Sequence, residues 1–175
     1  MKTSVYIGTS LDGFIARNNG DIAWLTQFAN DKAILAYKEF MRAIDAIVIG
    51  RGTLEKILTF PAWPYDKKVF VLSTTIKEVP EPIAGNVSVV AMSPDKLLNH
   101  LSGRGFSNLY IDGGKVIQAF LKQDLIDELI IAKVPVLIGK GIPLFADLDI
   151  DINFEHNRTE VSSNGLVRSY YERLN

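Results

Sequence analysis

The sequence predicts a three-layer α/β domain in which helices cover both faces of a mostly parallel central sheet. Short apolar stretches rich in β-branched residues, such as 46–50 and 69–72, suit buried parallel strands. Segments with apolar residues at helical spacing, such as 33–44, alternate with these stretches. The chain closes with two extended segments around Asn164–Gly165, which is typical of an antiparallel hairpin. Strands that alternate with helices and are followed by such a hairpin indicate this fold class.

The expected strands follow from the apolar stretches, taken in chain order. The C-terminal hairpin has one arm that extends to Ser163 and a second arm from Leu166 to Glu172. The strands expected before it are 5–7, 46–50, 69–72, 87–91, 109–112 and 128–134, with a continuation over 135–139 after a break.

The expected helices are placed by their start signals. Asn30 or Asp31 is suited to cap the first long helix. A short helix follows Gly50 and ends near residue 58, because two prolines in 59–65 cannot continue it. Ser93 and the proline after it begin another helix. Apolar residues at 116, 117, 120 and 121 give the last helix one buried face, and 77–86 is expected to be a surface connection.

The composition excludes several classes of function. The formal net charge is −1 and no run of like charges is present, so we expect neither nucleic-acid nor membrane binding. The chain has no cysteine, which removes disulfides and thiolate metal sites and fits a reducing cytoplasm. His100 and His156 are its two histidines, so we expect no metal site. No apolar run reaches membrane-spanning length, and we expect one cytoplasmic domain over residues 1–175.

Three of the expected parallel strands end in small or polar residues. These ends are Gly50–Thr53, Ser73–Thr75 and Gly113–Lys115. Ligands of open α/β sheets bind at the carboxyl ends of the strands, so we expect the three ends to converge on one edge. The first and third ends add helix N-terminal N–H groups, and Arg51 and Lys115 add charge, which suits a pyrophosphate. The alternative is that Gly50 and Gly52, like Gly113 and Gly114, only form a tight turn between a strand and a helix.

The residues after the strand 69–72 bear on the choice of nucleotide. A site for an unphosphorylated ribose usually has an acid after the second strand. No acid follows Leu72 directly, the nearest being Glu78, and Lys77 lies close by. The hydroxyl groups of Ser73–Thr75 therefore suit a 2′-phosphate, unless these residues only begin a loop.

Several of these motifs resemble those of the dihydrofolate reductase superfamily in order and approximate spacing. They are Ile49–Glu55, Val71–Ser73 and Tyr110–Val116. Two further stretches, 10–16 and 134–145, look more like the riboflavin-biosynthesis branch, whose reductase domain acts on a pyrimidine ribosylamine phosphate. The resemblance covers nearly the whole chain and implies a dihydrofolate-reductase-like fold.

The resemblance also implies NADPH as the cofactor and a small molecule as the substrate. Because the cofactor carries the hydride, the protein would mainly bind, orient and exclude water. The cofactor-binding residues that the resemblance implies are Thr9 and Ala16 beside the nicotinamide, Gly50, Arg51 and Thr53 on one side of the pyrophosphate, Gly113, Gly114, Lys115 and Val116 on its other side, and Ser73 and Thr74 at the 2′-phosphate, next to Leu72.

The substrate end departs from the pattern of the superfamily. Trp24 matches the tryptophan of dihydrofolate reductases, but the position of their pterin-binding acid holds Ala29. Asp31 is the nearest carboxylate, although it also suits a helix cap. Asp12 is another candidate acid, although it also suits a turn. Trp24 and Trp63 are the candidates for contact with the substrate, and Trp63 equally suits the core or an interface.

Two functions from different classes follow from these observations. One is an NADPH-dependent reductase of a heterocycle, either a pterin or a pyrimidine ribosylamine phosphate. The other is a dinucleotide-binding sensor or assembly module without catalysis, which Ala29 favours. A phosphotransferase is disfavoured because no glycine-rich loop ends in Lys-Ser or Lys-Thr. The riboflavin branch also suggests a homodimer, with the apolar stretch 134–145 at its interface.

Overall fold

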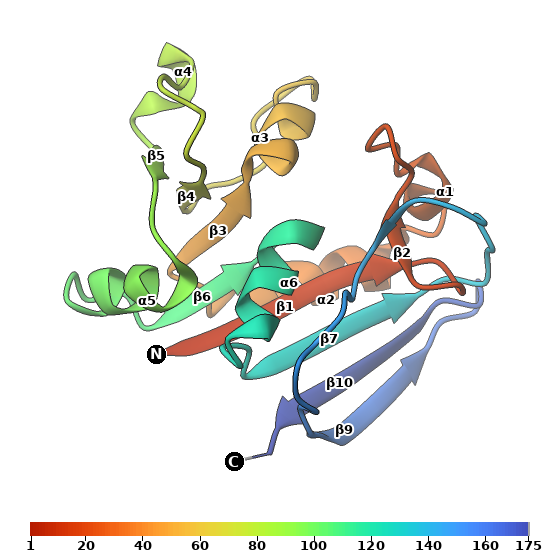
Figure 1. The fold of residues 1–175 in the computed structure, drawn as a ribbon. Coiled ribbons are helices and arrows are strands. Elements are labelled where there is room, and N and C mark those ends of the chain that lie inside the picture. Colours follow the sequence, from red (N-terminus) through yellow and green to blue (C-terminus); the bar gives the residue numbers. More distant parts are fainter. Residues whose placement is uncertain (175) are drawn as a thin grey trace.

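An eight-stranded sheet forms the centre of the protein in the computed structural model, which describes residues 1–174 (Figure 1). Its strands are β1 (Lys2–Thr9), β3 (Ala46–Gly50), β4 (Lys68–Leu72), β5 (Val87–Val90), β6 (Asn108–Ile111), β7 (Glu128–Lys133), β9 (Phe154–Val161) and β10 (Val167–Arg173). The strand order is β5-β4-β3-β6-β1-β7-β10-β9. In this order, neighbouring strands from β5 through β4, β3, β6 and β1 to β7 are parallel to one another. Strand β10 is antiparallel to both β7 and β9. The predicted parallel sheet with an antiparallel C-terminal hairpin is confirmed.

Helices cover both faces of this sheet, as the three-layer prediction requires. They are α1 (Ala23–Thr26), α2 (Asp31–Arg42), α3 (Arg51–Ile57), α4 (Glu81–Ala84), α5 (Pro94–Ser102) and α6 (Gly114–Lys122). In β3, Val48 belongs to the apolar cluster that includes α5 and α6, whereas Ile47 and Ile49 belong to the cluster that includes α2 and α3. Alternate side chains of a strand point to opposite faces, so the two clusters lie on either side of the sheet. Figure 1 accordingly shows α6 in front of the sheet and α2 behind it.

The middle of the sheet is the most deeply buried part of the fold. Residues 46–49 of β3 are completely inaccessible to solvent, and β3 lies between β4 and β6. An apolar, mostly β-branched sequence suits this position because both faces of the strand pack against side chains. The strand therefore holds a fixed position at its carboxyl end, where Gly50 leads directly into α3.

The local start signals are mostly confirmed, with two differences. Asn30 caps α2, because its Oδ1 accepts a hydrogen bond from the Ala33 N–H at 2.8 Å. Ser93 occupies the N-cap of α5, but its side chain makes no capping hydrogen bond there. The segment 77–86, predicted as a plain connection, contains the single turn α4. Pro82 lies in the first turn of this helix, where a missing N–H costs nothing.

The predicted strand over 135–139 is wrong. β7 ends at Lys133, and the chain beyond it lacks regular structure until β8 (Ile142–Pro143), which pairs with β2 (Phe14–Ala16). The backbone groups here are satisfied by the loop after β1, not by a strand: Leu11 N–H donates to the Val136 carbonyl at 2.8 Å. The Asp12 carboxylate accepts from the N–H groups of residues 138 and 139. Apolar content alone predicted a strand where no neighbouring strand is available.

Two kinds of feature are missing from the described residues. No helix within 1–174 is long and apolar enough to cross a membrane. The same residues contain no cluster of three or more His, Asp or Glu side chains that could hold a metal ion.

Candidate functional site

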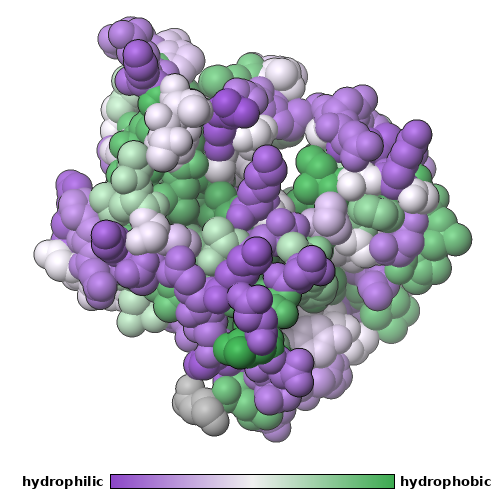
Figure 2. All heavy atoms as spheres, in the orientation of Figure 1, coloured by the Kyte–Doolittle hydropathy of each residue, from purple (hydrophilic) through white to green (hydrophobic). Residues whose placement is uncertain are grey.

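A cleft of about 1180 Å³ opens at the carboxyl ends of the parallel strands. Figure 2 shows the molecule hollowed between the part that contains β4, β5 and α4 and the part that contains β2 and α1. All three predicted strand ends line this cleft, so the predicted convergence is confirmed. The expected cofactor residues that line it are Ala16, Gly50, Arg51, Thr53, Leu72, Ser73, Thr74, Gly113, Gly114, Lys115 and Val116.

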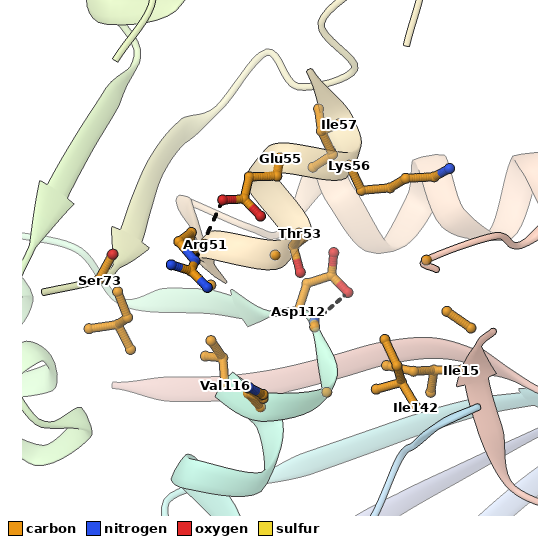
Figure 3. A pocket seen from close by; sticks show the side chains of 18 of the residues that line it. Ile15, Arg51, Thr53, Glu55, Lys56, Ile57, Ser73, Asp112, Val116 and Ile142 are labelled. Atoms are coloured by element: carbon orange, nitrogen blue, oxygen red, sulfur yellow. Dashed lines mark hydrogen bonds and ion pairs between the residues drawn. The ribbon is translucent and has the colours of Figure 1, made fainter. Parts of the chain in front are cut away.

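The end of β4 and the start of α3 meet in a polar cluster at one end of the cleft. Arg51 donates from Nη1 to the Thr75 Oγ1 at 3.3 Å, and its Nε lies 3.5 Å from a carboxylate oxygen of Glu55. The Ser73 Oγ lies 3.3 Å from the Thr75 Oγ1 and also accepts from backbone N–H groups of the turn. Figure 3 shows the Arg51 guanidinium lying on the side of α3 that faces Ser73. One exposed cation and two hydroxyl groups are thus gathered within reach of a single anion.

Two glycine turns interlock in the middle of the cleft. Gly113 has a φ of +92°, and a Cβ built on it would lie 2.2 Å from the Thr53 Oγ1 of the neighbouring turn. Gly114 is also tightly packed, because its Cβ would lie 3.0 Å from Ile142 and 3.1 Å from Ile15. Glycine suits position 113 because of its positive φ and because the Thr53 side chain fills the place of a Cβ, and it suits position 114 because the Ile142 and Ile15 side chains pack against it. Both glycines line the cleft.

The N-terminus of α6 faces the same space. Gly114 and Lys115 are its first two residues, and both line the cleft. N–H groups in the first turn of a helix have no carbonyl of a preceding turn to bond, and together with the helix dipole they favour an anion. Lys115 adds an exposed positive charge. This is a suitable cradle for a diphosphate.

Asp112 lies on the floor of the cleft, and sequence reasoning missed it as a functional candidate. Its Oδ1 accepts the Gly113 N–H at 2.8 Å, and its Oδ2 accepts the Tyr65 hydroxyl at 3.3 Å. Desolvation raises the pKa of Asp112 above its ordinary value, and hydrogen bonds from Gly113 and Tyr65 only partly oppose this rise. Figure 3 shows its carboxyl group beside Thr53. The available signal was an acid placed between a buried strand and a glycine pair.

The other end of the cleft is formed by the loop after β2 and the end of α3. Asn18, Asn19 and Phe60 line it together with Lys56. A Cβ on Gly20 would lie 3.7 Å from the Lys56 Cδ, so the stem of Lys56 lies against this loop. Within residues 1–174 Lys56 makes no ion pair. This end is therefore polar, cationic and partly aromatic.

Five of the predicted site residues do not line the cleft. Thr9 is 2% exposed, and its Oγ1 has no hydrogen-bond partner within residues 1–174. Trp24 is buried against the chain after β7, although its neighbour Leu25 does reach the cleft. Trp63 packs edge-on to Tyr65, with 5.7 Å between the ring centroids. The remaining two are the candidate acids: Asp12 binds the backbone of 138–139, and Asp31 is the exposed first residue of α2.

The comparison with protein families decides which family this chain belongs to. Residues 62–168 match the family model of the RibD C-terminal domain. The chain belongs to the RibD C-terminal domain family. The matched residues include the end of β4, the Gly113 turn and the first arm of the hairpin, whereas the Gly50 turn lies before the match.

Solved structures share the fold over the whole chain. A putative riboflavin biosynthesis protein from Shewanella sp. PV-4 is 41% identical with a TM-score of 0.94, and the alignment covers 100% of both chains. A diaminohydroxyphosphoribosylaminopyrimidine deaminase/5-amino-6-(5-phosphoribosylamino)uracil reductase from Thermotoga maritima is 20% identical with a TM-score of 0.78, covering 99% of this chain and 56% of that one. Dihydrofolate reductase from Enterococcus faecalis, complexed with NADP(H) and RAB-propyl, is 16% identical with a TM-score of 0.71, covering 99% and 97%. The two structures of lower identity show that the fold is dihydrofolate-reductase-like, and nothing beyond the fold.

Proposed function

We propose that the protein is an NADPH-dependent reductase that transfers a hydride to a small heterocycle. The observation that carries this proposal is the convergence of Arg51, Ser73 and the Gly113–Gly114 turn in one cleft. Membership of the RibD C-terminal domain family supports a reductase, since the similar protein from T. maritima is named as one. The dihydrofolate reductase with the same fold is complexed with NADP(H), which supports a nicotinamide dinucleotide.

The residues present fit the phosphate groups of such a dinucleotide. The N-terminus of α6, whose first residues Gly114 and Lys115 line the cleft, would receive the diphosphate. The resemblance places Arg51 at the pyrophosphate, but its guanidinium donates to the Thr75 hydroxyl after β4. We therefore propose that Arg51 binds the 2′-phosphate with Ser73 and Thr74, in exchange for part of the Arg51–Glu55 ion pair. Such a phosphate distinguishes NADPH from NADH.

The apolar middle of the cleft would hold the nicotinamide, which supplies the hydride when the dinucleotide is bound. Ile15, Ala16 and Ile142 line this region, and the first two are at most 8% exposed. Packed apolar side chains here orient a flat ring and exclude water from it. Thr9, which the resemblance places beside the ring, is buried and does not line the cleft.

The substrate would lie between Asp112 and the polar end of the cleft. Tyr65 and Phe60 offer aromatic surface to a planar heterocycle, and Asn18 and Lys56 offer polar contacts to a substituent. These features fit a pyrimidine ribosylamine phosphate, because Lys56 would face its anionic group. A pterin such as dihydrofolate is the second substrate class to be tried.

The experiment that tests the proposal has two stages. Calorimetric titration with NADPH and with NADH is expected to give one site per chain and tighter binding of NADPH. NADPH oxidation is then followed at 340 nm with 5-amino-6-(5-phosphoribosylamino)uracil and with dihydrofolate. Failure to bind either dinucleotide, or tighter binding of NADH, would overturn the proposed function.

One observation favours the non-catalytic alternative. Ala29, at the position of the acid of dihydrofolate reductases, is exposed and lies outside the cleft. A dinucleotide-binding sensor or assembly module would bind NADPH without oxidising it in the presence of either substrate. Oxidation well above the substrate-free rate eliminates this alternative.

We also propose that the protein forms a homodimer. The segment 134–145 carries exposed apolar side chains, with Leu137 69% and Phe145 48% accessible to solvent. Exposed apolar surface of this kind is found at protein interfaces. Sedimentation velocity at micromolar concentration is expected to give a dimer that Leu137→Glu dissociates, and a wild-type monomer would contradict the proposal.

A further inference from the structure

A second cavity lies between α2 and the segment 64–67, outside the cleft. It has a volume of about 620 Å³, within the range of pockets that hold small ligands, and it shares no lining residue with the cleft. One wall is α2 together with Ala29, the residue before its cap, and the other wall is Pro64, Asp66 and Lys67. We call this cavity the α2 groove.

The α2 groove runs along the length of its helix. Three successive turns of α2 each contribute two neighbouring side chains to it, and these pairs are Ala33 and Ile34, Tyr37 and Lys38, and Met41 and Arg42. Residues four apart lie above one another on a helix, so the three pairs form one straight wall. At 1.5 Å per residue, the wall from Ala33 to Arg42 is about 13 Å long. The space is therefore elongated, which favours a narrow, extended ligand over a compact one.

The cationic side chains of both walls gather at one end of the α2 groove. On α2 the first pair is aliphatic, and lysine or arginine enters only in the second and third pairs. On the other wall, Lys68 pairs with Ala46 at the start of β3, four residues beyond the end of α2. Lys67, the residue before it, therefore lies at the Arg42 end. The opposite end keeps an aliphatic surface, where Ile34 is 46% exposed.

Two of these cations are available to a ligand. Within residues 1–174, Lys38 and Lys67 make no ion pair, whereas Arg42 pairs with Glu39. Asp66 is the acid that lines the groove, and it pairs with neither lysine. The C-terminus of α2, which carries a partial negative charge, lies at the same end. This balance of charge favours a singly charged anion, such as a carboxylate, over a doubly charged phosphate.

An elongated space with one aliphatic end and one cationic end matches an unbranched apolar chain with an anionic head. We propose that the α2 groove binds a medium-length alkyl carboxylate. The chain lies along Ala33 and Ile34, and the carboxylate lies between Lys38 and Lys67. A chain of about eight carbons, with zigzag bonds of about 1.5 Å, fits within the length of the helix wall. The inference goes beyond the proposed reductase function, because it requires neither dinucleotide nor substrate.

The α2 groove adjoins the substrate end of the cleft through one stretch of chain. Pro64 lines the groove, and Tyr65 beside it lines the cleft and donates to Asp112 at 3.3 Å. Trp63, on the other side of Pro64, packs edge-on to Tyr65. A ligand that contacts Pro64 therefore touches the segment that presents Tyr65 to the substrate, and the emission of Trp63 reports on it.

Calorimetric titration with octanoate tests the class of ligand. We expect saturable binding at one site per chain. Hexanoate, which is shorter by two methylene groups, should bind about 5-fold more weakly, and octanamide, which carries no charge, about 10-fold more weakly. Absence of saturable octanoate binding, or equal affinity for octanamide, would overturn the proposal.

Substitutions on both walls test the location of the site. Lys38→Gln and Lys67→Gln should each weaken octanoate binding about 3-fold. Ala33→Leu, which fills the aliphatic end and keeps a good helix former there, should weaken it about 10-fold or more. Lys32→Gln is the matched control, because Lys32 is exposed on α2 and does not line the groove. Wild-type affinity in the double variant of Lys38 and Lys67 would overturn the site.

Fluorescence and competition separate the α2 groove from other places where octanoate could bind. Octanoate should change the emission of Trp63 in the wild type and in Trp24→Phe, since Trp24 packs in a separate cluster. Leu137→Glu, which alters the exposed apolar segment 134–145, should keep the octanoate affinity within about 2-fold. Unchanged emission at saturation, or displacement of octanoate by NADPH, would overturn the proposal. Failure of NADPH to bind would contradict the reductase function, and the lysine variants would still decide whether octanoate occupies the α2 groove.

Discussion

Substituting Gly113 by alanine tests whether the two glycine turns depend on each other. The backbone conformation of Gly113, with φ +92° and ψ 136°, costs a non-glycine residue about 1–3 kcal/mol. The new Cβ would also lie 2.2 Å from the Thr53 Oγ1, and such overpacking costs about 1–3 kcal/mol. We therefore expect Gly113→Ala to lower the free energy of unfolding by about 2–6 kcal/mol.

A double-mutant cycle separates these two contributions. Thr53→Ala removes the Oγ1 and leaves the Thr53 Cβ at 3.5 Å, an ordinary contact, so it should recover the overpacking part but not the backbone part. Urea unfolding of both single variants and the double variant gives the coupling energy, expected to be about 1–3 kcal/mol. Gly52→Ala is the matched control, because a Cβ there meets no atom within 4 Å. Additive effects, or Gly113→Ala within about 0.5 kcal/mol of the wild type, would refute the reasoning.

Three further predictions concern charged residues. Arg51→Gln should weaken NADPH binding roughly 10-fold in calorimetric titration and NADH binding much less, and equal losses would contradict a 2′-phosphate contact. Because the pKa of Asp112 is raised, its contribution to stability is present below pH 3.8 and is lost as the pH rises through the folded-state pKa. The unfolding free energy of the wild type, measured with urea, should thus fall relative to that of Asp112→Asn as the pH rises over this range. The same pH dependence in both proteins would contradict a raised pKa of Asp112. The pKa of Asp12 is lowered by hydrogen bonds from Ser10 and from residues 138–139, so its contribution is present above pH 3.8 and is lost as the pH falls through the folded-state pKa. Asp12→Ala should speed amide exchange at 138–139, and unchanged exchange there would show that the carboxylate does not hold this loop.

The architecture could be predicted because local patterns agree with it. The apolar residues 46–49 require burial on two faces, and the Asn164–Gly165 turn joins two arms of suitable length. The cleft followed from the same reasoning, since strand ends that are polar in sequence must meet at one edge of a parallel sheet. Arg51 and Ser73 were therefore placed together although 22 residues separate them.

What could not be predicted depends on contacts between distant segments. The environment of Asp112 depends on its hydrogen bond with Tyr65, which comes from another part of the chain. No local pattern marks such a meeting, and an acid before two glycines looks like a turn. The segment 135–139 is apolar enough for a strand, but its backbone hydrogen bonds go to the loop around Asp12. Trp24 likewise matched a substrate-binding position in sequence, yet its ring packs in a separate apolar cluster.

Hydrogen exchange with and without NADPH is the most direct test of the central claim that three strand ends bind one dinucleotide. We predict slower amide exchange in residues 50–53, 73–76 and 113–117 together, and no change in β9, which lies at the far edge of the sheet. Protection of only one of these segments, or protection centred on the cavity between α2 and the segment 64–67, would contradict the account.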